Sequence, residues 1–77
     1  MKEATFKKIP LGTLDRLNRY ADNGFHSESE AERMIWEARI TTACSVMFDC
    51  GVLAMHERIE VSAYYYNILC YGRTVNI

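Results

Sequence analysis

The chain has 77 residues, of which 49% are hydrophobic and 25% are charged, with four glycines and one proline. This composition excludes a disordered, collagen-like or low-complexity protein, and the length fits a single domain over residues 1–77. Nine Lys and Arg against ten Asp and Glu give a formal net charge of −1, which excludes the broad basic excess of a non-specific nucleic-acid binder.

The first 22 residues predict a short strand followed by a helix. Residues 4–9 contain Thr, Phe and Ile and end at Pro10, whose fixed φ suits the start of a helix. Apolar residues then recur at helical spacing from Leu11 to Ala21, and the glycine of Asn23-Gly24 supplies a left-handed stop. We therefore expect a helix over about residues 11–22.

A long second helix is predicted over about residues 28–50. Ser27 and Glu30 have the spacing of a capping box, which predicts a helix start at Glu28. Apolar residues then occupy most of the girth, and one of their stripes is Ala31, Ile35, Ala38 and Thr42. Because a helix that is apolar nearly all round is buried, we expect this one to pack against its own chain and between the subunits of a dimer.

The last segment, about residues 55–71, has two readings. Val61, Tyr65 and Leu69 have helical spacing, whereas Tyr64 and Tyr66 alternate as in a strand. We predict a helix that ends at Gly72, with a strand as the alternative. The expected fold class is therefore mainly α, with a short N-terminal strand.

Charge is unevenly distributed along the chain. Residues 1–19 hold five Lys or Arg against two Asp or Glu, a net charge of +3, and residues 20–40 hold two against five, a net charge of −3. Such asymmetry is found where a nucleic-acid face lies beside a protein-binding face, and also on helices whose charged surface is simply solvated.

The first half of the chain resembles the ribbon-helix-helix family of dimeric DNA-binding proteins. The resemblance covers residues 4–42 and is most specific in the run GFHSESEAERMI, residues 24–35, where the glycine, Ser29-Glu30, Arg33 and Ile35 are in register with the family. It implies that the strands of two chains pair as a ribbon in the major groove, while the start of the second helix holds a phosphate.

The resemblance also implies which residues contact DNA. Thr5, Lys7 and Lys8 would face the bases, and Ser27 with Ser29 would lie near a phosphate. This hypothesis describes a small dimeric transcriptional regulator that binds double-stranded DNA.

A non-enzymatic inhibitor or antitoxin-like protein from a phage or mobile element, for example one of the anti-CRISPR kind, is the alternative. It would act by binding a protein or nucleoprotein complex directly. The acidic cluster Glu28, Glu30 and Glu32 would match a basic cleft, and the run Tyr64-Tyr65-Tyr66 would form an aromatic interface.

The residue types that carry chemistry do not form a catalytic pattern. Cys50 and His56 are six residues apart, which is poor geometry on a helix. We expect no enzyme, no metal site, no cofactor and no small-molecule substrate. Three cysteines without close spacing indicate free thiols in a reducing compartment, and the sequence shows neither a signal peptide nor a stretch of about 20 apolar residues, so we expect a cytoplasmic protein without a membrane span.

Overall fold

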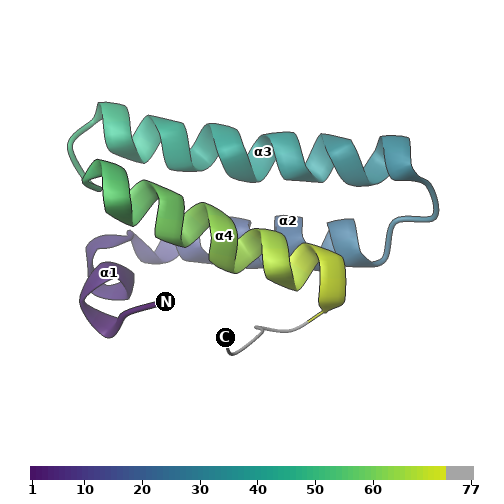
Figure 1. Ribbon diagram of the computed structural model, residues 1–77, viewed down its shortest axis with the longest axis horizontal. Coiled ribbons are helices and arrows are strands. Elements are labelled where there is room, and N and C mark those ends of the chain that lie inside the picture. The colour runs from purple at the N-terminus through teal and green to yellow at the C-terminus, as the bar shows by residue number, and fades with distance from the viewer. Residues whose placement is uncertain (73–77) are drawn as a thin grey trace.

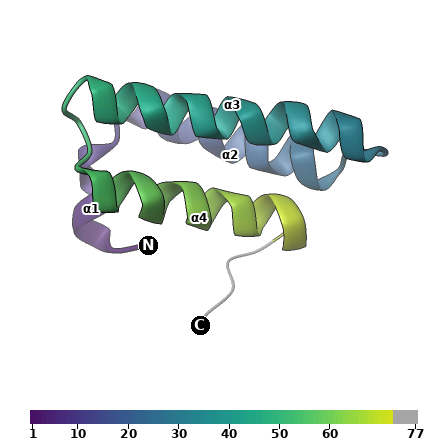
Figure 2. The ribbon, with the colours of Figure 1, turned by 45° about the horizontal axis from the view of Figure 1, so that its top comes forward.

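A computed structural model describes residues 1–72 and contains four helices (Figure 1). They are α1 (Glu3–Lys8), α2 (Leu11–Phe25), α3 (Glu30–Asp49) and α4 (Met55–Tyr71). Helices α2, α3 and α4 contact one another along their lengths, with α3 antiparallel to the other two, and α1 lies at one end of this bundle (Figures 1 and 2). The predicted mainly α fold is confirmed.

The predicted N-terminal strand is wrong, because residues 4–8 belong to α1 and residues 1–72 contain no strand. Long-range contacts hold this short helix in place. The Glu60 carboxylate accepts hydrogen bonds from the Lys2 backbone N–H (2.6 Å) and from the Thr5 hydroxyl (3.3 Å), and the Phe6 ring meets Tyr64 edge-on with ring centroids 5.5 Å apart. The ribbon implied by the family resemblance is therefore not seen in the described residues.

Helix α2 extends three residues beyond its predicted end, so Gly24 is helical and not a left-handed stop. Its position is explained by a close approach between helices. A Cβ at Gly24 would lie 2.5 Å from Leu69 Cδ1 and 3.3 Å from Trp36 Cβ. The missing side chain thus lets α2 pack closely on α4.

Helix α3 begins at Glu30, two residues later than predicted. The Ser29 hydroxyl accepts the backbone N–H of Glu32 at 3.1 Å and caps the helix. Ser27 instead donates to the Asn23 carbonyl oxygen at 2.9 Å, at the end of α2. The cap therefore lies at the second serine of the turn.

Burial of α3 is narrower than predicted. Ile40, Cys44 and Met47 face the core, whereas Ile35 and Val46 are 54% and 52% exposed. The expectation of a helix buried over most of its girth is therefore wrong within one chain, because α2 and α4 cover only part of α3. Burial between subunits remains a prediction.

Helix α4 confirms the helical alternative for residues 55–71. Val61, Tyr65 and Leu69 recur every four residues and are almost completely buried. Gly72, with φ of 75°, ends the helix as predicted, and its N–H is donated to the Ile68 carbonyl oxygen. Among the described residues, no helix is long and apolar enough to cross a membrane.

Candidate protein-binding groove

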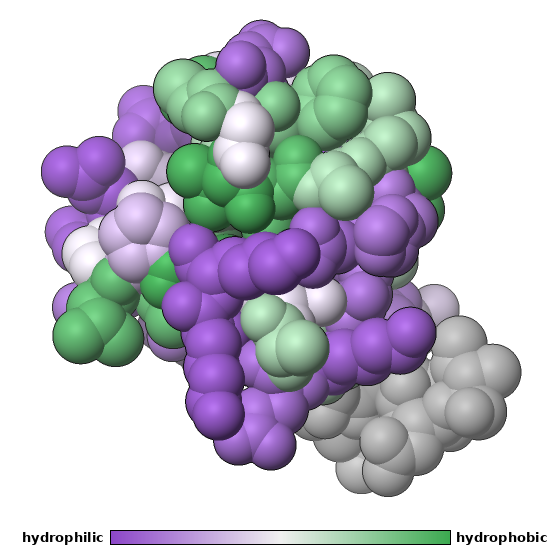
Figure 3. All heavy atoms as spheres, turned by 90° about the vertical axis from the view of Figure 1, so that its left-hand side faces the viewer, coloured by the Kyte–Doolittle hydropathy of each residue, from purple (hydrophilic) through white to green (hydrophobic). Residues whose placement is uncertain are grey.

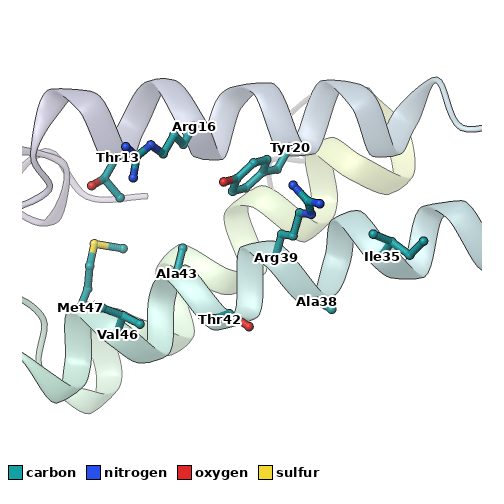
Figure 4. Close-up of a pocket in the computed structure, with 10 residues that line it drawn as sticks. All are labelled: Thr13, Arg16, Tyr20, Ile35, Ala38, Arg39, Thr42, Ala43, Val46 and Met47. Carbon is teal, nitrogen blue, oxygen red and sulfur yellow. The ribbon is translucent and has the colours of Figure 1, made fainter.

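An open groove runs between α2 and α3, on the side of these helices away from α4 (Figure 4). Its volume is about 600 Å³. Ten residues of the two helices line it: Thr13, Arg16, Tyr20, Ile35, Ala38, Arg39, Thr42, Ala43, Val46 and Met47.

Small side chains on α3 leave the space that forms the groove. Ala38, Thr42 and Ala43 lie in the middle of the α3 wall, and the larger Ile35 and Val46 lie toward its two ends (Figure 4). Residues three or four apart share a helix face, so the groove side of α3 is a continuous, mostly apolar stripe. The groove therefore presents unpartnered apolar surface along about three turns of helix.

The charge in the groove is entirely positive. Arg16 and Arg39 are among the lining residues, and none of the ten is acidic. The Arg39 guanidinium stacks over Trp36, 4.9 Å from the ring centroid, and lies 5.9 Å from the Tyr20 ring. Because cation–π contacts hold a guanidinium without neutralising it, Arg39 presents a positioned positive charge to whatever enters the groove.

Two of the predicted DNA-contacting residues make contacts with α4. Thr5 is buried against Glu60. Lys8 Nζ lies 2.7 Å from the Glu57 carboxylate, which also accepts the backbone N–H of Ala54 at 2.9 Å. The hydrogen bond from Lys8, followed by that from Ala54, holds the pKa of Glu57 below its usual range. Thr5 and Lys8 therefore tie α1 to α4, with Thr5 buried and the Lys8 side chain 50% exposed.

Of the other three predicted DNA contacts, Lys7 lies on α1, whereas Ser27 and Ser29 lie together in the turn between α2 and α3. Lys7 is exposed and pairs with Glu3 at 3.4 Å on the same helix. Ser29 caps α3, and Ser27 closes the end of α2. The two serines are near the acidic start of α3, where Glu28, Glu30 and Glu32 oppose the approach of a phosphate.

The predicted partner-binding residues divide into exposed and buried members. The acidic cluster Glu28, Glu30 and Glu32 is exposed, and none of the three lines the groove. On α4, Tyr65 is completely buried, Tyr64 is half-buried, and Tyr66 is 45% exposed. Consecutive helical residues point about 100° apart, so the three tyrosines cannot form one surface.

Tyr65 is buried with an unpartnered polar atom. Its hydroxyl finds no hydrogen-bond partner among the residues the structure describes. Burial, with smaller contributions from Tyr64 and Cys44, raises the pKa of Tyr65 to about 12. This tyrosine is a core residue rather than an interface residue.

A second, smaller hollow of about 260 Å³ lies between α3 and α4 and includes Glu37, Thr41 and Tyr66. The bundle end that carries α1 and the α3–α4 turn also exposes apolar side chains among hydrophilic ones (Figure 3). Leu11, which is 80% exposed, and Met55 are among the exposed apolar residues of the helix ends there. The α2–α3 groove is the larger of the two hollows and combines apolar surface with positioned charge.

Within residues 1–72, no group of three or more His, Cys, Asp or Glu side chains is placed to hold a metal ion. The cysteines are free: Cys44 is buried, Cys70 is half-buried and Cys50 is exposed. Burial raises the pKa of the Cys44 thiol, which leaves it protonated and unreactive.

Sequence reasoning placed Ile35, Ala38 and Thr42 on one stripe, but expected that stripe to be buried against its own chain and between subunits. It missed Arg16 and Arg39 as site residues. The only sequence signal concerns Arg39, which follows Trp36 by three residues. This spacing places the guanidinium beside the ring on one helix face.

No protein-family model matches this sequence, and comparisons with curated proteins and with solved structures find no match.

Proposed function

We propose that this chain is a non-enzymatic binding protein, of the inhibitor or antitoxin-like kind, that acts by docking a protein target in the α2–α3 groove. The observation that supports this proposal most strongly is the groove: an apolar trough of about 600 Å³ with two arginines and no carboxylate in its lining. Contiguous exposed apolar surface on a small protein is typical of an interaction site.

The composition of the groove also supports protein binding. Arginine and aromatic residues are enriched among the residues that dominate binding energy at protein interfaces. Arg39 stacked on Trp36 and Tyr20 joins these features in one place. An arginine that is already held in position loses less side-chain entropy when a partner binds.

Site-specific photocrosslinking tests the proposal. A photoreactive amino acid is placed at Thr42, which is exposed in the groove, and in a matched control at Asn18, which is exposed outside it. In cells that encode this chain, we expect Thr42 to crosslink to a defined second protein. The substitution Val46→Asp should remove that product, and Asn18 should not give it. The absence of any product that depends on the groove would refute the proposal.

A DNA-binding regulator is the second candidate, supported by cationic side chains that remain exposed. Lys7 on α1 and Arg19 on α2 are both open to solvent. Fluorescence anisotropy of a mixed-sequence duplex, titrated at several salt concentrations, tests this candidate. Binding that weakens steeply with salt and is lost in the double variant Lys7→Ala, Arg19→Ala would support it. No binding at low salt would remove it.

The predicted homodimer is a separate proposal. A second subunit on the exposed apolar surface of α3 would cover Ile35 and Val46 and would therefore compete with a protein target for the groove. Sedimentation velocity over a range of concentrations measures the association directly, and a single monomeric species at high concentration would contradict the dimer.

A further inference from the structure

We infer that the occupant of the α2–α3 groove is an amphipathic α-helix of a partner protein, about three turns long, with carboxylates beside its apolar stripe. This inference rests on the proposed function, since it names the chemistry of the segment that the groove would bind.

The dimensions of the groove suit a helix. Its α3 wall extends from Ile35 to Met47, which corresponds to about 18 Å at 1.5 Å per residue and matches a helix of about 12 residues. Ala38 and Thr42 in the middle of this wall leave room for a neighbouring backbone, while Ile35 and Val46 form ridges toward the ends (Figure 4). Such a surface accepts the ridges of another helix at an interaxial distance of about 8–10 Å.

The two arginines define the charge of the occupant. The side chains of Arg16 on α2 and Arg39 on α3 extend toward opposite ends of the groove (Figure 4). None of the lining residues is acidic, so both positive charges are available to a partner. Asp or Glu side chains beside the apolar stripe of a docked helix would complement them.

A second copy of this chain does not supply these carboxylates through the same surface. In an isologous dimer the groove would face the groove of the other copy, so the arginines of both copies would lie together. None of the ten lining residues is acidic, so this face offers no carboxylate to pair with them. The complementary charges therefore belong to a different protein.

A displayed library of 14-residue helix-forming peptides, randomised at every surface position, is the probe. The full chain is the bait in one selection, and the double variant Arg16→Glu, Arg39→Glu is the bait in a second. We expect the wild type to select an apolar stripe with Asp or Glu beside it, and the reversed variant to select Lys or Arg in place of these carboxylates. For the best synthetic peptide, changing the selected carboxylates to lysine should weaken binding to the wild type by at least about tenfold.

The controls separate charge from folding. The variant Arg19→Glu, Arg33→Glu carries the same change in net charge on exposed residues outside the groove, and it should bind the peptide as the wild type does. Circular dichroism melts verify that each bait is folded, and Thr42→Trp should block the groove.

Three results would overturn the inference. Peptides that Thr42→Trp excludes but that show no preference for carboxylates would remove the charge pattern and leave the proposed function standing. If no selected peptide needs an open groove for binding, both this inference and the proposed function are refuted. Self-association of the wild type that Thr42→Trp abolishes would make a second copy the occupant.

Discussion

Replacing Gly24 by alanine tests the close packing of α2 on α4. An added Cβ would lie 2.5 Å from Leu69 Cδ1 and 2.6 Å from Leu69 Cγ, far inside van der Waals contact. Leu69 is almost fully buried, so its side chain has little room to move away. Overpacking of this kind costs about 1–3 kcal/mol. Alanine recovers roughly 0.5–1 kcal/mol of helix propensity, so we expect a net loss of about 1–2 kcal/mol in the free energy of unfolding.

Gly12 provides the matched control in the same helix. A Cβ there meets no atom within 4 Å, so Gly12→Ala gains helix propensity without a steric clash. We expect Gly12→Ala to raise the free energy of unfolding by roughly 0.5–1 kcal/mol.

Urea unfolding followed by circular dichroism at 222 nm measures both variants. For a domain of this size, a loss of 1 kcal/mol lowers Tm by about 4–8 °C, so Gly24→Ala should also melt visibly earlier than the wild type. If Gly24→Ala is as stable as Gly12→Ala, Leu69 can relax and the close approach does not restrict this position.

Three further predictions concern buried and reactive groups. The lowered pKa of Glu57 means that its ion pair with Lys8 stabilises the fold above the ordinary glutamate value of 4.5, and that this stabilisation is lost as the pH falls through the lowered pKa. Glu57→Gln should therefore be less stable than the wild type at pH 7, with a difference that shrinks on acidification; parallel pH profiles of unfolding would contradict this. Tyr65→Phe removes an unpartnered buried hydroxyl, so calorimetry should show unchanged stability or a gain of up to about 1 kcal/mol, whereas a clear loss would indicate a partner for that hydroxyl. At neutral pH, a thiol reagent should modify Cys50 rapidly, because Cys50 is exposed. It should modify Cys44 only on unfolding, because Cys44 is buried and burial raises the pKa of its thiol. Mass spectrometry of digests taken at early times measures the order of modification.

The helices that could be predicted from sequence are those whose core pattern repeats several times. In α4, Val61, Tyr65 and Leu69 recur at one spacing over more than two turns, and the predicted bounds match the structure. Segment 4–9 is too short for such a repeat, so its propensities suggested a strand. The hydrogen bonds of Glu60 to Lys2 and Thr5 come from residues more than 50 positions away and favour the helix.

Gly24 illustrates a second limit of local reasoning. An Asn-Gly pair after a helical pattern usually ends a helix, yet here the helix continues through it. Glycine serves equally where the backbone must turn to positive φ and where two helices approach closely. Which of these applies depends on Leu69 and Trp36, which lie on other helices.

Local periodicity was enough to place Ile35, Ala38 and Thr42 on one face of α3, because helical geometry depends only on spacing along the chain. Whether that face is buried depends on where α2 and α4 pack, and those contacts join residues far apart in the sequence. The same packing places Arg16 across the groove from α3 and Arg39 over two aromatic rings. The stripe is therefore a property of the sequence pattern, whereas its exposure and its charged flanks arise from the way the helices pack.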